Sequence, residues 1–297
     1  MIIPRLMLGT ARIAGGASES AAVALVRTAF DAGVGAVDTA PSYGLGTAEQ
    51  VVGKALTGHP QVEVTTKLGS HRPSHPMLRT WARRIKRLVS APGEPEASLP
   101  PARIEVPVGN DFSVRAMARS HDLSLERLGR IDALLFHDIS AQEVTPAVLG
   151  DLAGLAQGRP SGYASYACWD KELDQRFVPE SVAQCAPDPG WLTGTASPPH
   201  GRPLRLHSIA KTGLALAATD LLFAQGLDRA AGLIEADPLT AQIAAIYALA
   251  AARVPQAHLL FTSSHPARLG ALIKALQQVD EQHTAATIAA CFPAQPG

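Results

Sequence analysis

The sequence predicts an α/β protein folded as a (β/α)₈ TIM barrel, and three observations lead to this fold class. Eight short apolar runs, each typical of a buried strand, are centred near residues 6, 36, 64, 133, 163, 183, 206 and 260. Most of them alternate with segments of helical period, which favours parallel βα units. The chain has 297 residues, and eight such units usually occupy about 250 residues.

The competing architecture is an open, doubly wound sheet. That fold requires a Gly-rich phosphate turn with defined spacing after its first strand. The text after the first predicted strand, Gly-Thr-Ala-Arg-Ile-Ala-Gly-Gly, has the wrong spacing. Because we find no internal repeat or long low-complexity run, we expect residues 1–297 to form one barrel domain. An irregular insertion at about 70–110 and a short C-terminal extension complete the prediction.

The first four βα units have clear boundaries. Ser18 is a suitable N-cap and Gly33 a suitable end for the first helix, and Gly58 and Gly129 can close the next ones. The predicted strands are 5–9, 34–38, 62–67 and 131–136, and the later helices are 47–56 and 112–128. Within the insertion we expect a basic helix at 77–89, a Pro-rich loop at 90–101 and a strand at 103–108, which Pro107 restricts to an edge.

The second half alternates less regularly. Pro146 lies in the first turn of a predicted helix that ends at Gln157, just before Gly158. The segment 167–202 is expected to be mostly irregular, apart from a brief strand, because of Pro187, Pro189, Gly190, Pro198 and Pro199. The predicted strands are 161–165, 182–185, 204–209 and 258–261. The remaining helices follow the seventh strand as far as residue 236 and then cover 239–252 and 266–278.

Composition restricts the partners that we expect. Lys and Arg together number 26, as do Asp and Glu, so the formal net charge of zero gives no sign of a nucleic-acid partner. No apolar run approaches about 18 residues, and the N-terminus lacks a signal-peptide pattern, so we expect no membrane partner. Three scattered cysteines favour reduced thiols in a cytoplasmic protein over disulfides or a metal site. The sequence predicts no protein partner.

Polar residues end three consecutive predicted strands. Asp38 ends the second, Lys67 the third, and His137 follows the fourth, while Tyr43 lies five residues after Asp38. In a barrel these strand ends meet at one mouth, where active sites lie. We expect Asp38 and Lys67 to form an ion pair, because a buried charge is costly without a partner. A nearby ammonium is also expected to lower the pKa of Tyr43 so that its phenol can exchange a proton.

These residues and their surroundings resemble the aldo-keto reductase family. The resemblance rests on Asp-Thr-Ala-Pro-Ser-Tyr-Gly at 38–44, Val-Thr-Thr-Lys-Leu-Gly at 64–69 and Asp-Ala-Leu-Leu-Phe-His-Asp at 132–138. It implies a (β/α)₈ barrel that binds NADPH, or less often NADH, and transfers hydride between nicotinamide and a small-molecule carbonyl or alcohol. The implied catalytic residues are Asp38, Tyr43, Lys67 and His137.

The resemblance also implies cofactor-binding residues in the second half of the chain. Ser165 and Gln184 correspond to residues that hold the nicotinamide amide. Arg268 corresponds to an arginine that binds the adenosine phosphate, and Ser263 and Ser264 lie beside the start of the same predicted helix. The sequence departs from the family here, because an Asn after Ser165 is absent and Thr262, Ala271 and Leu272 replace the usual Lys, Glu and Asn.

Two alternatives of other classes remain open at this point. The same barrel could use Tyr43 and Lys67 for proton transfer without redox chemistry, as an isomerase, lyase or cyclase. It could also be a non-catalytic binding subunit, although such a protein has no need of a buried Lys–Asp pair.

Overall fold

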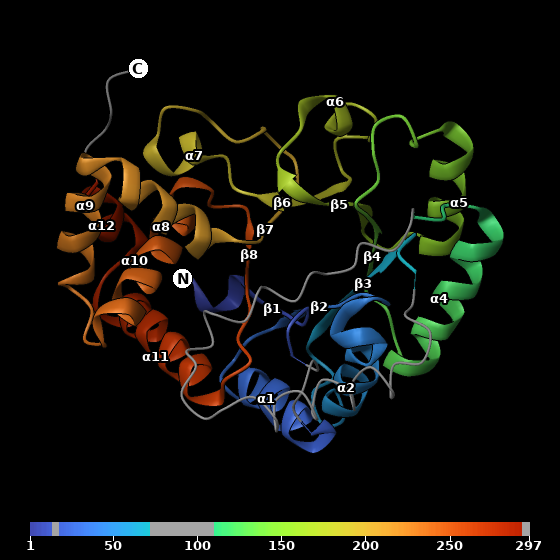
Figure 1. The fold of residues 1–297 in the computed structure, drawn as a ribbon, viewed down its shortest axis with the longest axis horizontal. Helices are drawn as coiled ribbons and strands as arrows, with labels where there is room; N and C mark the ends of the chain where they lie inside the picture. Colours follow the sequence, from blue (N-terminus) through green and yellow to red (C-terminus); the bar gives the residue numbers. More distant parts are fainter. Residues whose placement is uncertain (14–17, 72–109, 293–297) are drawn as a thin grey trace, which may run out of the picture.

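The computed structural model describes residues 1–13, 18–71 and 110–292. Within them, eight parallel strands close into a barrel in chain order, so the predicted (β/α)₈ fold is confirmed (Figure 1). The strands are β1 (Leu6–Gly9), β2 (Ala36–Asp38), β3 (Glu63–Leu68), β4 (Ala133–His137), β5 (Ser161–Cys168), β6 (Val182–Ala186), β7 (Leu204–Leu206) and β8 (His258–Phe261). The helix, loop and strand predicted between 77 and 108 lie outside the described residues.

The helices surround this barrel, with α8 to α12 gathered on the side opposite α4 and α5 (Figure 1). They are α1 (Glu19–Asp31), α2 (Ala48–Ala55), α4 (Val114–Leu128), α5 (Pro146–Ala156), α6 (Lys171–Asp174), α7 (Pro189–Thr193), α8 (Ile209–Thr219), α9 (Leu221–Ala231), α10 (Pro238–Arg253), α11 (Pro266–Gln282) and α12 (Ala285–Ala290), with 3₁₀ turns η1 (Ile3–Arg5) and η2 (Tyr43–Gly46).

Local capping accounts for the helix boundaries that the sequence indicated. The Ser18 hydroxyl accepts a hydrogen bond from the N–H of Ala21 at the start of α1. Gly129 ends α4 with a φ of 78°, a left-handed conformation that favours glycine. Pro146 occupies the first turn of α5, where its missing N–H costs nothing.

Two predicted irregular segments contain helices. Residues 167–202 hold α6 and α7, which begin at the capping carboxylates of Asp170 and Asp188 and are too short to show an apolar period. The C-terminal extension forms α12, whose Ile288 is buried. β7 is shorter than predicted and ends at Leu206, because Ser208 turns the chain into α8 with a φ of 56°.

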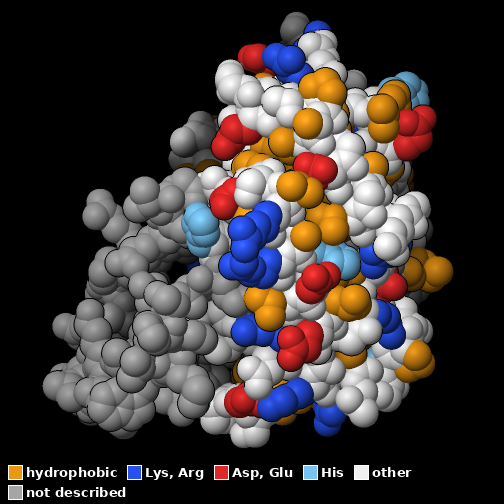
Figure 2. Space-filling model, turned by 90° about the vertical axis from the view of Figure 1, so that its right-hand side faces the viewer, with side chains coloured by type: hydrophobic (Ala, Val, Ile, Leu, Met, Phe, Trp, Pro, Cys, Tyr) orange, Lys and Arg blue, Asp and Glu red, His pale blue; other side chains and the backbone are white. Residues whose placement is uncertain are grey.

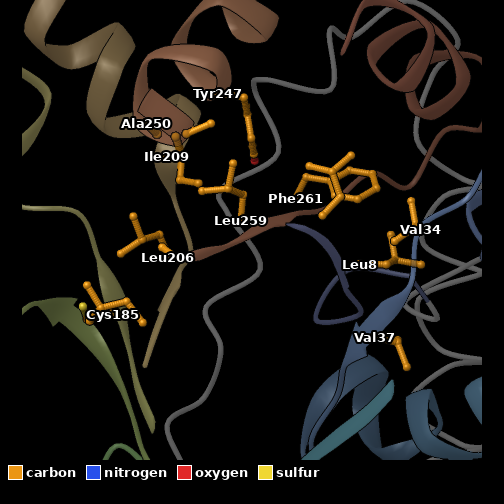
Figure 3. Packing of buried hydrophobic residues seen from close by; sticks show 14 of the residues in the cluster. Leu8, Val34, Val37, Cys185, Leu206, Ile209, Tyr247, Ala250, Leu259 and Phe261 are labelled. Carbon is orange, nitrogen blue, oxygen red and sulfur yellow. The ribbon is translucent and has the colours of Figure 1, made fainter. Parts of the chain in front are cut away.

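The main apolar core lies between the strands and the helices. Leu206 and Leu259 point outward from β7 and β8 toward Ile209, Tyr247 and Ala250, which belong to α8 and α10 (Figure 3). This outer layer is one continuous cluster that extends around the barrel. Among the described residues, the barrel interior contributes only two small apolar clusters, Met7, Ala36 and Leu260, and Leu135, Ala164 and Val182.

The molecular surface is mixed in charge. On the face shown in Figure 2, basic and acidic side chains are interspersed with scattered hydrophobic ones. In the parts of the chain that the structure describes, no helix combines the length and apolar character needed to cross a bilayer.

Candidate active site

An ion pair between β2 and β3 forms the base of the site. The Lys67 ammonium nitrogen Nζ lies 2.6 and 2.7 Å from the two carboxylate oxygens of Asp38 and 3.1 Å from the carbonyl oxygen of Thr39. Both charged side chains are buried. An ion pair removed from water is maintained only when its donors and acceptors are satisfied, and these contacts use all three N–H groups of the ammonium. The predicted pairing of Asp38 with Lys67 is therefore present.

Lys67 contacts Tyr43 through the face of the aromatic ring. Its Nζ lies 4.7 Å from the centroid of the ring, a cation–π arrangement. Burial, followed by the charges of Asp38 and Asp138, raises the pKa of Tyr43 well above its ordinary value of 10. The sequence analysis predicted a lowered pKa for Tyr43, and this prediction is wrong, because burial and the two carboxylates outweigh the effect of the ammonium. Near neutral pH the side chain is a phenol, which is the form that donates a proton.

The loop after β2 holds Tyr43 in place. Tyr43 begins η2, in which Gly44 and Leu45 both have left-handed backbone angles, φ 56° and 61°. The hydroxyl of Thr47 donates to the Gly44 carbonyl at 2.7 Å, and Arg127 of α4 donates to the Gly46 carbonyl at 2.9 Å. A non-glycine residue such as Leu45 adopts this conformation at a cost that the surrounding contacts must offset. Such strain is typical of functional loops.

His137 ends β4 beside Tyr43. The two rings meet edge to face, with centroids 5.5 Å apart and planes at 86°. Burial and the charge of Lys67 lower the pKa of His137 from 6.5 to about 3, so the imidazole is neutral near pH 7. Its Nδ1 atom is buried and has no hydrogen-bond partner among the described residues. A neutral imidazole can orient a substrate oxygen through one N–H group.

Two neighbours that the sequence analysis missed fix the end of β4. Asp138 has a φ of 50°, its N–H donates to the carbonyl of Ala164 at 2.7 Å, and its Oδ1 accepts the N–H of Tyr166 at 2.6 Å. Asn110 donates from Nδ2 to the His137 carbonyl at 2.7 Å. Asp138 could have been identified from its place beside His137 at the end of a predicted strand. Asn110 lies at the end of the predicted insertion, where no sequence pattern indicated a role for it.

His207, just after β7, is a further ionisable group near the mouth. Its Nε2 lies 2.7 Å from the carbonyl oxygen of Ser165, and its Nδ1 lies 3.0 Å from the Ser208 hydroxyl. Burial lowers its pKa, which the bond to Ser165 and the charge of Asp38 partly oppose. Residue 207 was expected to lie within the strand 204–209, so no role was predicted for it. A polar residue at the end of an apolar run was the signal.

Gln184 and Ser165 differ in what they offer a bound amide. Gln184 lies on the inner face of β6, is 2% exposed, and its Oε1 has no partner among the described residues. A buried amide oxygen without a donor is costly unless a ligand supplies one. Ser165 is partly exposed, and its Oγ accepts the N–H of Ala167 at 3.2 Å, while its hydroxyl hydrogen can still donate.

The predicted phosphate-binding residues surround the start of α11. The Ser263 hydroxyl donates to the carbonyl of His265 and accepts its N–H, both at 3.1 Å, so it shapes the turn after β8. Ser264 and Arg268 are exposed, Arg268 in the first turn of α11. The first turn of a helix presents N–H groups that can bind a phosphate. β8 places this turn at the same end of the barrel as Asp38 and His137.

Comparison with curated proteins gives two longer alignments. The chain is 30% identical over 169 residues to a D-threo-aldose 1-dehydrogenase of Pseudomonas sp, covering 54% of this chain and 48% of the relative. It is 30% identical over 157 residues to a pyridoxal 4-dehydrogenase of Microbacterium luteolum, covering 47% of this chain and 41% of the relative. The aligned part of the chain thus spans about half, or less, of the length of these relatives.

Solved structures share the fold over nearly the whole chain. The holo form of the aldo-keto reductase AKR11C1 from Bacillus halodurans superposes with a TM-score of 0.62 at 17% identity, covering 99% of this chain and 93% of that one. An aldo/keto reductase from Klebsiella pneumoniae, in complex with NADP and acetate, gives a TM-score of 0.58 at 19% identity with the same coverage. The sequence pattern of the Aldo/keto reductase family matches residues 5–166, more than half of the chain. The chain therefore belongs to the aldo-keto reductase family.

Proposed function

We propose that this protein is an NADPH-dependent oxidoreductase that reduces the carbonyl of a small aldehyde or ketone to an alcohol, or catalyses the reverse reaction. The observation that carries the proposal is the buried Asp38–Lys67 pair, whose ammonium lies under the ring of Tyr43. A family member without this chemistry would have no need of a buried ion pair that costs free energy.

Tyr43 is the proton donor in this proposal. Its raised pKa keeps the proton on the phenol until a stronger base forms beside it. As carbonyl reduction places negative charge on the substrate oxygen, that oxygen becomes such a base. The Lys67 charge, 4.7 Å from the ring centroid, stabilises the phenolate that remains after transfer. In the reverse direction the same phenolate accepts the proton of the alcohol.

His137 orients the substrate oxygen. The ring is neutral, so its contribution is a directed hydrogen bond and not a full positive charge. The edge-to-face contact with Tyr43 brings the two donors to the same part of the mouth. Two donors that converge on one oxygen stabilise charge that develops there.

The residues of this chain fit a nicotinamide cofactor, which supplies or accepts the hydride when bound. The unpartnered Oε1 of Gln184 can accept a hydrogen bond from the nicotinamide amide, and Ser165 can donate one to it. Arg268 and the first turn of α11 can bind the adenosine phosphate. Because Thr262, Ala271 and Leu272 supply no charge there, we expect measurable but loose binding, with NADPH preferred to NADH.

The names of the relatives support the proposed substrate class. Two relatives carry the names of dehydrogenases for an aldose and for pyridoxal, and the structure from Klebsiella pneumoniae contains NADP and acetate. These names favour a small molecule as the substrate of this chain also.

The test is the consumption of NADPH by wild-type protein and Tyr43→Phe with a panel of small aldehydes and ketones. We expect Tyr43→Phe to lower kcat by about 10³-fold, since general acid catalysis contributes on this order, while the melting temperature changes little. Tyr166→Phe is the matched control, because it removes a phenol that is 72% exposed and keeps the backbone contact to Asp138.

Two outcomes would count against the proposal. A folded Tyr43→Phe protein that keeps most of its activity would remove Tyr43 from the role of donor. A wild-type protein that binds neither NADPH nor NADH at millimolar nucleotide would favour the redox-neutral alternative.

A further inference from the structure

The interior of the barrel contains a second buried cation below the Asp38–Lys67 pair. Interiors of such barrels are usually filled by branched apolar side chains. Here Arg205 of β7 is only 5% exposed. Its Nη1 donates to the Thr65 hydroxyl and its Nη2 to the Glu63 carboxylate, each at 2.5 Å, across the barrel to β3.

The alternation of β7 explains why Arg205 points inward. Leu204 and Leu206 belong to the outer apolar layer, so the residue between them faces the barrel axis. On β3 the same alternation directs Glu63, Thr65 and Lys67 to the interior. The inner face of β3 is therefore polar along its whole length.

Strand register brings Arg205 close to the catalytic carboxylate. Asp38 is the register partner of Thr65, the residue whose hydroxyl binds the Arg205 guanidinium. The charge of Asp38 acts to raise the pKa of Arg205, although burial lowers it overall. Burial lowers the pKa of Lys67, Asp38 opposes this shift, and the charge of Arg205 adds to the lowering. Negative and positive charges thus alternate from the N-terminal end of the barrel strands to the mouth at their C-terminal ends. The order is Glu63, Arg205, Asp38 and Lys67.

A purely structural role does not account for this cation. Replacing a buried ion pair with apolar side chains of similar volume is often neutral or stabilising. The Glu63 side chain is 35% exposed, so solvent weakens its pairing with Arg205. Asp38, with 2% exposure, is the buried anion that gains most from a second cation.

We propose that Arg205 is a positioning residue that neutralises part of the negative charge of Asp38. Asp38 then cancels less of the positive charge of Lys67, and more of that charge acts on Tyr43. This inference rests on the proposed function for its catalytic consequence. The charge sharing itself is a property of the folded protein and can be measured without turnover. The charged and titratable groups that surround Arg205 are Glu63 and Lys67 from β3, Asp38 from β2, and His258 from β8.

The first experiment is a double-mutant cycle on stability. Wild type, Arg205→Met, Asp38→Asn and the double variant are unfolded by denaturant at pH 7. Arg205→Met changes the unfolding equilibrium constant by one factor in wild type and by another in the Asp38→Asn background. We expect the second factor to be smaller than the first by about threefold or more, as is found for coupled residues. Equal changes in both backgrounds would show that Arg205 does not interact with Asp38 and would overturn the inference. If Arg205→Met does not fold, Arg205→Gln replaces it in the same cycle.

The second experiment measures the pH dependence of kcat for oxidation of benzyl alcohol with NADP. Removing the cation in Arg205→Met raises the pKa of the phenol, so the profile moves to higher pH and kcat at pH 8 falls about tenfold, with little change in KM. Removing the anion in Glu63→Gln moves the profile to lower pH. Arg205→Lys keeps the charge and keeps the profile close to wild type. Thr65→Val, which removes one hydrogen bond and no charge, is the matched control.

The outcomes separate the inference from the proposed function. If Arg205→Met and Glu63→Gln both lower kcat while the profile stays in place, Arg205 is a structural residue and the inference fails. If the cycle shows coupling but wild-type protein transfers no hydride with NADP or NADPH, the proposed function fails and the charge sharing stands.

Discussion

The two sides of the same strands differ sharply in this barrel. The outward side chains join the helices in one continuous apolar layer. Among the described residues, the inward side chains form only two small apolar clusters, and the other inward side chains include the charged groups of Asp38, Glu63, Lys67 and Arg205. The outward side chains therefore supply most of the apolar burial that stabilises the fold. The inward side chains, or inner layer, contribute less apolar packing and instead hold the charged groups.

β3 shows the contrast at the level of single residues. Val64 and Leu68 belong to the outer apolar cluster, whereas Glu63 and Lys67 make ion pairs inside the barrel. Because successive side chains alternate between the two faces, a shift of one residue in register would exchange the layers. Selective variants of each layer can therefore test whether stability and activity depend on different faces.

The largest effect is expected from Lys67→Met in the inner layer. This change leaves the buried Asp38 carboxylate without its partner, which typically costs about 3–5 kcal/mol of unfolding free energy. It also removes the charge that stabilises the Tyr43 phenolate, so we expect kcat to fall by about 10³-fold. Denaturant unfolding and steady-state kinetics measure the two effects. Lys54→Met, at a half-exposed ion pair, is the control, and an active Lys67→Met protein would refute the distinction between the layers.

The next effect is expected from Leu259→Ala in the outer layer. Leu259 is fully buried against α8 and α10, and truncation of such a leucine costs about 2–5 kcal/mol of unfolding free energy. Well below the melting temperature, kcat should stay close to the wild-type value. Leu221→Ala removes a leucine that is 73% exposed and should change stability by less than about 0.5 kcal/mol. A large loss of kcat in folded Leu259→Ala would show that the layers are not independent.

The sequence was sufficient for the strands and for the ion pair at the mouth. Most strands lie in short apolar runs bounded by turn residues, and the ends of β2, β3 and β4 bear Asp38, Lys67 and His137. The short helices α6, α7 and α12 were missed, because capping by Asp170 and Asp188 defines two of them more than any apolar period does.

The electrostatics of the site could be predicted only in part. The direction of the Tyr43 pKa depends on burial and on Asp138, whose position follows from the left-handed turn after β4. Arg205 was read as part of a strand with no role. Its alternation with Leu204 and Leu206 was the signal, but the sequence does not show which anion it meets across the barrel.

A smaller effect is expected from His137 and pH. The pKa of His137 is about 3 in the folded protein and about 6.5 when unfolded, so the unfolded state binds the proton more tightly. Its contribution to stability is therefore complete above pH 6.5 and is lost as pH falls toward 3. At pH 5 we expect this loss to reach about 2 kcal/mol in wild type and to be absent in His137→Gln.

Unfolding by urea at pH 7.5 and pH 5 measures this difference. His200→Gln, at an exposed imidazole, is the control and should behave as wild type does. If His137→Gln loses as much stability as wild type between the two pH values, the imidazole does not belong to the buried inner layer.

The smallest effect is expected from Arg268→Ala, because Arg268 belongs to neither layer. It is exposed in the first turn of α11, at the mouth and outside the barrel wall. Arg268→Ala removes a charge-assisted hydrogen bond to the 2′-phosphate, so we expect it to raise the dissociation constant of NADPH about tenfold above the wild-type value. NADH lacks that phosphate, so its affinity should change by less than about twofold. Nicotinamide fluorescence titrations measure both constants, and Lys274→Ala, further along the same helix, is the matched control. Equal affinity of the wild type for the two nucleotides would make Arg268 a surface residue without a role in binding the 2′-phosphate.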